Sequence, residues 1–125
     1  MLRFSVLTTS CLMMLSGVAL AEGDVANGEK AFKKCMACHA VADATNKTGP
    51  HLVGVVGRKP GSVEGYKYSD SLLEFAATGA VWDEANLDKY LENPKSLAPK
   101  GKMAYAGSKK PEERADLIAF LKTKM

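Results

Sequence analysis

The sequence predicts an all-α fold with three main helices, short additional helices and long loops rich in glycine and proline. Two observations support this prediction. Three segments place apolar residues at helical spacing behind residues that can cap a helix, and no pair of neighbouring runs alternates as strands of a sheet would. With 125 residues, 46% of them hydrophobic and 25% charged, the chain has the length and composition of one globular domain.

The first 21 residues have the pattern of a cleaved secretory signal peptide. Met1 to Arg3 gives a short positive end, residues 4–18 are mostly apolar, and Ala19-Leu20-Ala21 fits a small-x-small cleavage site. We therefore expect cleavage after Ala21, export to the periplasm, and one mature domain at residues 22–125. An uncleaved membrane anchor is the alternative, but polar residues interrupt the apolar run, which is shorter than the roughly 20 residues that span a bilayer.

The first predicted helix begins near Asp24, which can cap it, and continues through Phe32 to Cys35. Residues 41–68, which follow, contain five glycines and two prolines, so neither a long helix nor a regular strand is expected there. A loop of this length is uncommon in a compact domain unless it is ordered by something that it wraps. We therefore expect a bound group to supply part of the core.

Three further helices are predicted after this loop. A short helix begins at residue 69 or 70 and ends at Gly79. Asp83 can cap the next, which has apolar side chains at positions 87, 90 and 91 on one face and stops at Asn93-Pro94. The last helix begins near Pro111, with two glutamates in its first turn and an apolar side at positions 117, 118, 120 and 121.

The stretch KKCMACHA, residues 33–40, carries the most specific chemical signal in the chain. At helical spacing, Cys35, Cys38 and His39 point to the same side. Two thiols there can add to the two vinyl groups of a haem while the imidazole reaches its iron, and C-x-x-C-H is typical of c-type haem attachment. We therefore predict one haem c, bound covalently through Cys35 and Cys38, with His39 as an axial ligand.

Three other uses of these residues are possible. A thioredoxin-like redox pair would need a βαβ unit, which the sequence does not predict. A zinc site would draw on Cys35, Cys38, His39 and His51, but the second pair of ligands lacks the usual spacing. A structural disulfide suits an exported chain, although it leaves His39 without a function.

Met103 is the expected second axial ligand of the iron. Beyond the leader, Met36 lies inside the attachment motif and Met125 is the last residue, whereas Met103 follows a Pro99-Lys100-Gly101-Lys102 segment that can form a loop across the far face of the haem. His51 is the rival ligand. A ferric spectrum without a sulfur-to-iron charge-transfer band would favour it.

The charges exclude one class of partner and indicate another. A formal net charge of +3 is too small for a typical nucleic-acid-binding protein. Five lysines and no acidic residue lie between Asn93 and Pro111. We expect a set of lysines to surround the exposed haem edge and steer an acidic partner; its members are Lys34, Lys95, Lys102, Lys109 and Lys110.

Across residues 22–125 the chain resembles the class I c-type cytochromes, especially bacterial cytochrome c2 and mitochondrial cytochrome c. The resemblance rests on GEKAFKKCMACH, TGPHLVGVVGRKPG, YKYSD, YLENPK, KMAYAG and DLIAFLK. It implies a compact cytochrome c fold around the haem, in which Gly28 and Phe32 pack against Leu117 and Phe120.

The resemblance also implies roles for residues around the haem. These are Pro50 as carbonyl acceptor for the second nitrogen of His39, Tyr68 and Trp82 as hydrogen-bond donors to a haem propionate, Arg58 as its charge partner, and Tyr90 as the hydroxyl near the Met103 sulfur. The chain departs from the mitochondrial pattern at Lys100-Gly101, which replaces Gly-Thr and so lacks a hydroxyl contact to a propionate. Leu72 replaces an asparagine and Tyr105 a phenylalanine.

From these features we expect a soluble, monomeric, periplasmic electron carrier rather than an enzyme. Its partners would be membrane redox complexes, such as a quinol-oxidising cytochrome bc complex and a terminal oxidase or reaction centre. No nucleic-acid partner is expected. The alternative is a haem peroxidase or small-ligand binder that acts when Met103 dissociates.

Overall fold

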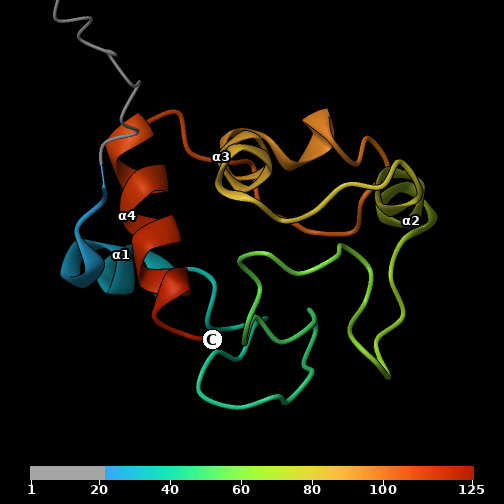
Figure 1. Ribbon diagram of the computed structural model, residues 1–125, viewed down its shortest axis with the longest axis horizontal. Helices are drawn as coiled ribbons and strands as arrows, with labels where there is room; N and C mark the ends of the chain where they lie inside the picture. Colours follow the sequence, from blue (N-terminus) through green and yellow to red (C-terminus); the bar gives the residue numbers. More distant parts are fainter. Residues whose placement is uncertain (1–21) are drawn as a thin grey trace, which may run out of the picture.

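The structure, a computed structural model, describes residues 22–125, and within that range it is all α-helical, as predicted, with no strand. Its helices are α1 (Val25–Phe32), α2 (Asp70–Ala77), α3 (Glu84–Glu92) and α4 (Pro111–Lys122), with a 3-10 helix η1 (Pro94–Ser96) between α3 and α4 (Figure 1). The predicted signal peptide and its cleavage site lie outside the described residues. No helix in the described range is long and apolar enough to cross a membrane.

The helices start where local sequence signals place them. Asp24, Ser69 and Asp83 are N-caps whose side chains accept hydrogen bonds from backbone N–H groups three residues ahead. Helix α4 has no such cap and begins with Pro111, which suits a first helical position because it lacks an N–H group.

Helix α1 ends at Phe32, so the prediction that it continues to Cys35 was wrong. The Cys35 N–H donates to the Phe32 carbonyl, only three residues back, at 2.7 Å, and this tighter bond ends the regular helix. The N–H groups of Cys38 and His39 then both donate to the Cys35 carbonyl, at 3.1 and 2.9 Å. The motif therefore occupies one separate turn directly after α1.

Helix α1 crosses α4 at close range (Figure 1). The Phe32 and Phe120 rings lie 5.3 Å apart, and Leu117 is buried in the same core cluster. A Cβ atom at Gly28 would lie 2.8 Å from that of Phe120 and closer still to the Asp116 carbonyl, so only glycine fits this crossing. The predicted contact between the first and last helices is thus formed.

A buried arginine joins α3 to α4. Arg114, only 7% exposed, donates to Asp88 Oδ1 at 2.7 Å and to the Ser108 carbonyl at 2.9 Å, and lies 3.7 Å from Glu92 Oε2. Its pKa is raised chiefly by the hydrogen bond to Asp88. These contacts fix the start of α4 against α3 and therefore the end of the segment that carries Met103.

The long loop at residues 41–68 contains neither helix nor strand, as predicted. It is ordered by hydrogen bonds to distant parts of the chain. The Gly57 N–H donates to the Trp82 carbonyl at 2.7 Å, the Trp82 N–H donates to the Arg58 carbonyl at 2.8 Å, and the Tyr66 hydroxyl donates to the Thr48 carbonyl at 2.8 Å. These bonds hold the middle of the loop against the segment before α3, and the end of the loop against its beginning.

Candidate haem site

Cys35 is partly buried, Cys38 is exposed, and no disulfide joins them. Burial raises the pKa of the Cys35 thiol, although the positive charge of Lys34 opposes this shift. Because the two cysteines are not joined, the structural disulfide is not formed. Within residues 22–125, no group of three His, Cys, Asp or Glu side chains is arranged to hold a metal ion, so the zinc arrangement with His51 is not formed either.

His39 is held in the form that can bind iron. Its Nδ1 lies 2.7 Å from the Pro50 carbonyl oxygen. Because that oxygen can only accept, Nδ1 carries the proton and Nε2 keeps a free lone pair. Burial lowers the pKa of His39, and the charges of Arg58 and Lys47 lower it further, whereas the bond to Pro50 acts in the opposite direction. The imidazole is therefore neutral and oriented for ligation.

Gly49 allows the loop to approach this imidazole. A Cβ atom at position 49 would lie 2.7 Å from His39 Nδ1 and 2.9 Å from Nε2, inside any normal contact distance. The Gly49 N–H donates to the Cys38 carbonyl at 2.8 Å, which fixes the loop to the motif turn. The sequence did not mark Gly49 as a site residue. Its contact with His39 spans ten residues of irregular structure, for which no periodic pattern predicts neighbours.

Met103 lies on the segment between η1 and α4, where its Sδ atom is 3.9 Å from the Tyr90 hydroxyl, which donates to it. Tyr90 projects from α3 and packs against Trp82, with ring centroids 4.9 Å apart. Burial raises the pKa of Tyr90, so its hydroxyl stays protonated and available as a donor. The sulfur is therefore positioned by α3 as well as by its own loop.

Arg58 provides a direct test of whether the site fits a haem. Its Nη1 donates to the His51 and Val53 carbonyls at 3.0 and 3.2 Å, but its buried Nε has no acceptor in the described part of the chain. Burial lowers the pKa of Arg58, which remains a cation because its unperturbed pKa is so high. A buried cation with an unused donor fits an anionic group such as a haem propionate.

Tyr68 and Trp82 lie close to Arg58 in the fold. The Tyr68 hydroxyl accepts from the Val63 N–H at 3.0 Å, which leaves its own proton free for another acceptor. Burial raises the pKa of Tyr68, so that proton is retained. Trp82 is buried, and its backbone bonds to Arg58 fix its position. The residues present therefore suit a haem with two thioether links, two axial ligands and buried carboxylates.

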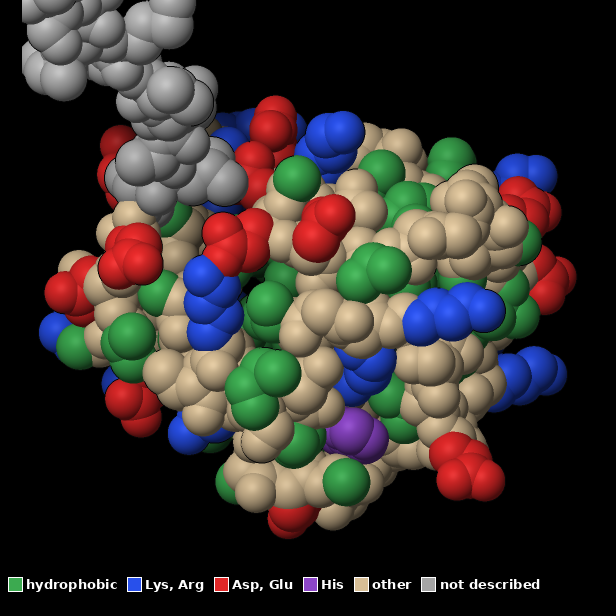
Figure 2. All heavy atoms as spheres, in the orientation of Figure 1, with side chains coloured by type: hydrophobic (Ala, Val, Ile, Leu, Met, Phe, Trp, Pro, Cys, Tyr) green, Lys and Arg blue, Asp and Glu red, His purple; other side chains and the backbone are tan. Residues whose placement is uncertain are grey.

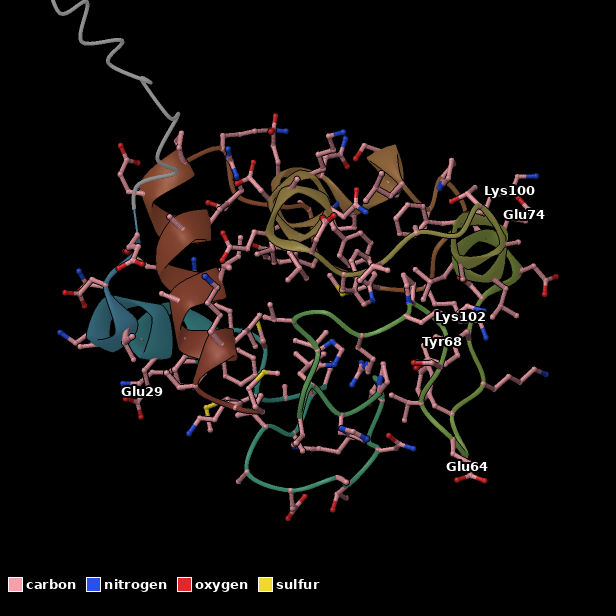
Figure 3. The ribbon with its side chains drawn as sticks, in the orientation of Figure 1. Glu29, Glu64, Tyr68, Glu74, Lys100 and Lys102 are labelled. Carbon is pink, nitrogen blue, oxygen red and sulfur yellow. The ribbon has the colours of Figure 1, made fainter. Side chains whose placement is uncertain are left out.

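The predicted docking lysines come from separate parts of the fold. Lys34 follows α1 and forms an ion pair with Glu113 at 3.6 Å, Lys95 lies in η1, and Lys109 and Lys110 precede α4. Figure 3 labels Lys102 together with Lys100 and Tyr68, which line a cavity of about 580 Å³ beside α2. On the face drawn in Figure 2, acidic side chains gather toward the end where the described chain begins, with Lys and Arg among them.

Three residues contribute contacts that sequence reasoning missed. Asn46 links two parts of the long loop, because its side chain accepts from the His51 N–H and donates to the Glu64 carbonyl, both at 3.1 Å. Tyr66, near the end of the same loop, is linked to Thr48 near its start. Ser71, in the first turn of α2, accepts from the Lys100 N–H at 3.0 Å. Apart from the bond between Asn46 and His51, each of these contacts joins residues at least 18 positions apart in sequence, so no local pattern predicts it.

Comparison with known proteins agrees with this geometry. Residues 25–124 match the cytochrome c family. The chain is 47% identical over 112 residues to cytochrome c2 of Rhodomicrobium vannielii, covering 89% of this chain and 87% of that protein. It is 52% identical over 102 residues to cytochrome c of Chlamydomonas reinhardtii, covering 80% and 88%. The solved structure of cytochrome cH from Methylobacterium extorquens superposes with a TM-score of 0.75 at 46% identity, covering 82% of this chain and all of that one.

Proposed function

The chain belongs to the cytochrome c family, and we propose that it works in the periplasm as a carrier of single electrons between membrane redox complexes. Cytochromes c carry electrons and are not enzymes, and this chain has one haem c attached through Cys35 and Cys38. The observation that supports electron transfer most directly is the ligand pair. With His39 and Met103 as axial ligands, the iron has no vacant position for a substrate.

The haem supplies a one-electron couple when bound, and the residues of the chain set its properties. The neutral imidazole of His39 is fixed in orientation by Pro50. A thioether favours ferrous iron, so Met103 raises the reduction potential, and the Tyr90 hydroxyl draws electron density from that sulfur in the same direction. Because both ligands are held by hydrogen bonds, they can stay in place in both oxidation states.

Arg58, Tyr68 and Trp82 would hold a propionate of the haem. The unused Nε donor and positive charge of Arg58 support this role, as does the free proton of the Tyr68 hydroxyl. A cation beside a buried carboxylate lowers the cost of burying that charge. The three residues would therefore anchor the propionate end of the haem and keep water away from the iron.

The lysines Lys34, Lys95, Lys102, Lys109 and Lys110 would guide an acidic surface of the partner toward the haem edge. The support for the last four is the absence of acidic residues between Asn93 and Pro111. Lys34 contributes least, because its charge is paired with Glu113. Candidate partners are a quinol-oxidising cytochrome bc complex as donor and a terminal oxidase or reaction centre as acceptor. Electrostatic steering would speed their encounter with the carrier and keep each complex short-lived.

Stopped-flow electron transfer from a purified cytochrome bc complex tests this proposal. The second-order rate constant should fall as ionic strength rises, because salt screens the steering charges. Lys95→Glu and Lys110→Glu should each slow transfer roughly tenfold at low salt, the lower end of the range over which electrostatic steering changes association rates. Lys89→Glu on α3 is the matched control and should have a smaller effect. A rate constant independent of salt, or equal losses for all three variants, would contradict the docking surface.

The alternative function, a peroxidase or small-ligand binder, requires Met103 to leave the iron. Its motivation is the Lys100-Gly101 sequence, which lacks the hydroxyl that related proteins place there. The hydrogen bond from the Lys100 N–H to Ser71 works against that alternative, because it holds the start of the same segment in place.

A further inference from the structure

The segment that carries Met103 is tied to α2 by one buried hydroxyl. The Lys100 N–H donates to Ser71 Oγ at 3.0 Å, across 29 residues of sequence, and Ser71 is only 7% exposed. Among residues 22–125 this is the only side-chain hydrogen bond that joins α2 to residues 97–107. The tie therefore has no second bond of its kind to replace it.

The remaining contacts of this segment show what the tie controls. On its N-terminal side, the Ala98 N–H donates to the Pro94 carbonyl at 3.0 Å, and the Gly101 N–H donates to the Ala98 carbonyl at 2.9 Å. The first bond joins the segment to η1 and the second forms a turn within it, so neither attaches it to α2. Met103 follows two residues later, and its side chain makes one long polar contact, with the Tyr90 hydroxyl at 3.9 Å.

We propose that Ser71 is a positioning residue that keeps the Met103 segment closed over the haem. Position 101 is glycine, so the segment has no hydroxyl of its own there. The Ser71 hydroxyl on α2 anchors the segment in its place. This inference rests on the proposed function, because it assumes that Met103 is an axial ligand. Ser71 does not touch the iron and acts only through the backbone of Lys100.

The space around the tie explains why its loss should matter. Ser71 and Lys100 both line the cavity of about 580 Å³ beside α2, which Lys102 and Glu74 also border (Figure 3). If the Ser71 hydroxyl is removed, the Lys100 N–H faces this cavity and can bond to water instead. The closed segment then loses an internal hydrogen bond that the open segment never had, so opening becomes more frequent.

Two measurements on the haem-containing protein test the proposal: the rate of cyanide binding to the ferric form, which requires Met103 to leave, and hydrogen exchange at the Lys100 N–H. Ser71→Ala should accelerate both by about five- to tenfold, the change expected for loss of one buried hydrogen bond. Ser71→Thr, which keeps the hydroxyl, should leave both within about twofold of the original. Thr78→Ala, which removes a hydroxyl from the opposite end of α2, is the matched control and should do the same.

The proposal is overturned if Ser71→Ala leaves both rates unchanged or if Ser71→Thr behaves like Ser71→Ala. It is also overturned if Thr78→Ala accelerates both rates as much as Ser71→Ala does. Failure of the proposed function gives a different result. If the unaltered ferric protein lacks a sulfur-to-iron charge-transfer band, Met103 is not a ligand. Hydrogen exchange at Lys100 still reports whether Ser71 holds the segment.

Discussion

Removing the Tyr90 hydroxyl isolates the effect of its hydrogen bond on the Met103 sulfur. In Tyr90→Phe the ring keeps its packing against Trp82, but the 3.9 Å contact from the hydroxyl to Sδ is lost. That donor withdraws electron density from sulfur, which destabilises ferric iron more than ferrous iron. The variant should therefore have a lower reduction potential than the unaltered protein.

The size of this shift follows from the strength of the bond. A long hydrogen bond to sulfur is weak, and we assign it about 0.5–1 kcal/mol of difference between the two oxidation states. For a one-electron couple about 59 mV corresponds to a tenfold change in equilibrium constant, or about 1.4 kcal/mol. The potential should therefore fall by about 20–40 mV.

Spectroelectrochemical titration measures this shift, with Tyr105→Phe as the matched control. Tyr105 is two residues from Met103, but its hydroxyl forms no hydrogen bond to the sulfur in the described part of the chain. Its loss should move the potential less than that of Tyr90. An unchanged or higher potential in Tyr90→Phe, with the charge-transfer band intact, would refute the assigned role of the hydroxyl.

Three further substitutions test the framework around the site by guanidinium unfolding of the ferric protein. Gly28→Ala should destabilise the fold by about 1–3 kcal/mol, because its Cβ would collide with α4; an unchanged midpoint would mean that the helices have room to separate. Arg114→Met should cost about 2–3 kcal/mol through loss of the bond to Asp88, and a neutral result would show that packing alone joins α3 to α4. Tyr66→Phe should cost about 1 kcal/mol and speed exchange in the loop after Thr48, whereas unchanged exchange would contradict its anchoring role.

Local signals were sufficient to predict where the helices begin. Asp24, Ser69 and Asp83 each accept a hydrogen bond from an N–H group three residues ahead, a contact that depends only on nearby sequence. The end of α1 was placed too late because Cys35 continues the apolar spacing of the helix, and spacing alone does not distinguish a helix from a tighter turn. The short helix η1 was also missed. Asn93-Pro94 was correctly expected to end α3, but that signal does not predict that the residues from Pro94 onward form a 3-10 turn.

The same limit separates the site residues that were predicted from those that were missed. Cys35, Cys38 and His39 form one contiguous motif, so their chemistry is visible in the sequence. The contact of Gly49 with the His39 ring and the bond between Ser71 and Lys100 join segments that meet only after folding. In a single sequence, nothing at one residue of such a pair identifies the other, so the contact becomes visible only in the three-dimensional structure.

The central claim is a haem bound through two cysteines and ligated by His39 and Met103, and a redox-controlled optical spectrum of the purified protein tests it most directly. We predict a reversible one-electron change between ferric and ferrous c-type spectra, with a sulfur-to-iron charge-transfer band in the ferric form only. A ferric spectrum without that band would contradict ligation by Met103. A colourless protein would contradict the whole account.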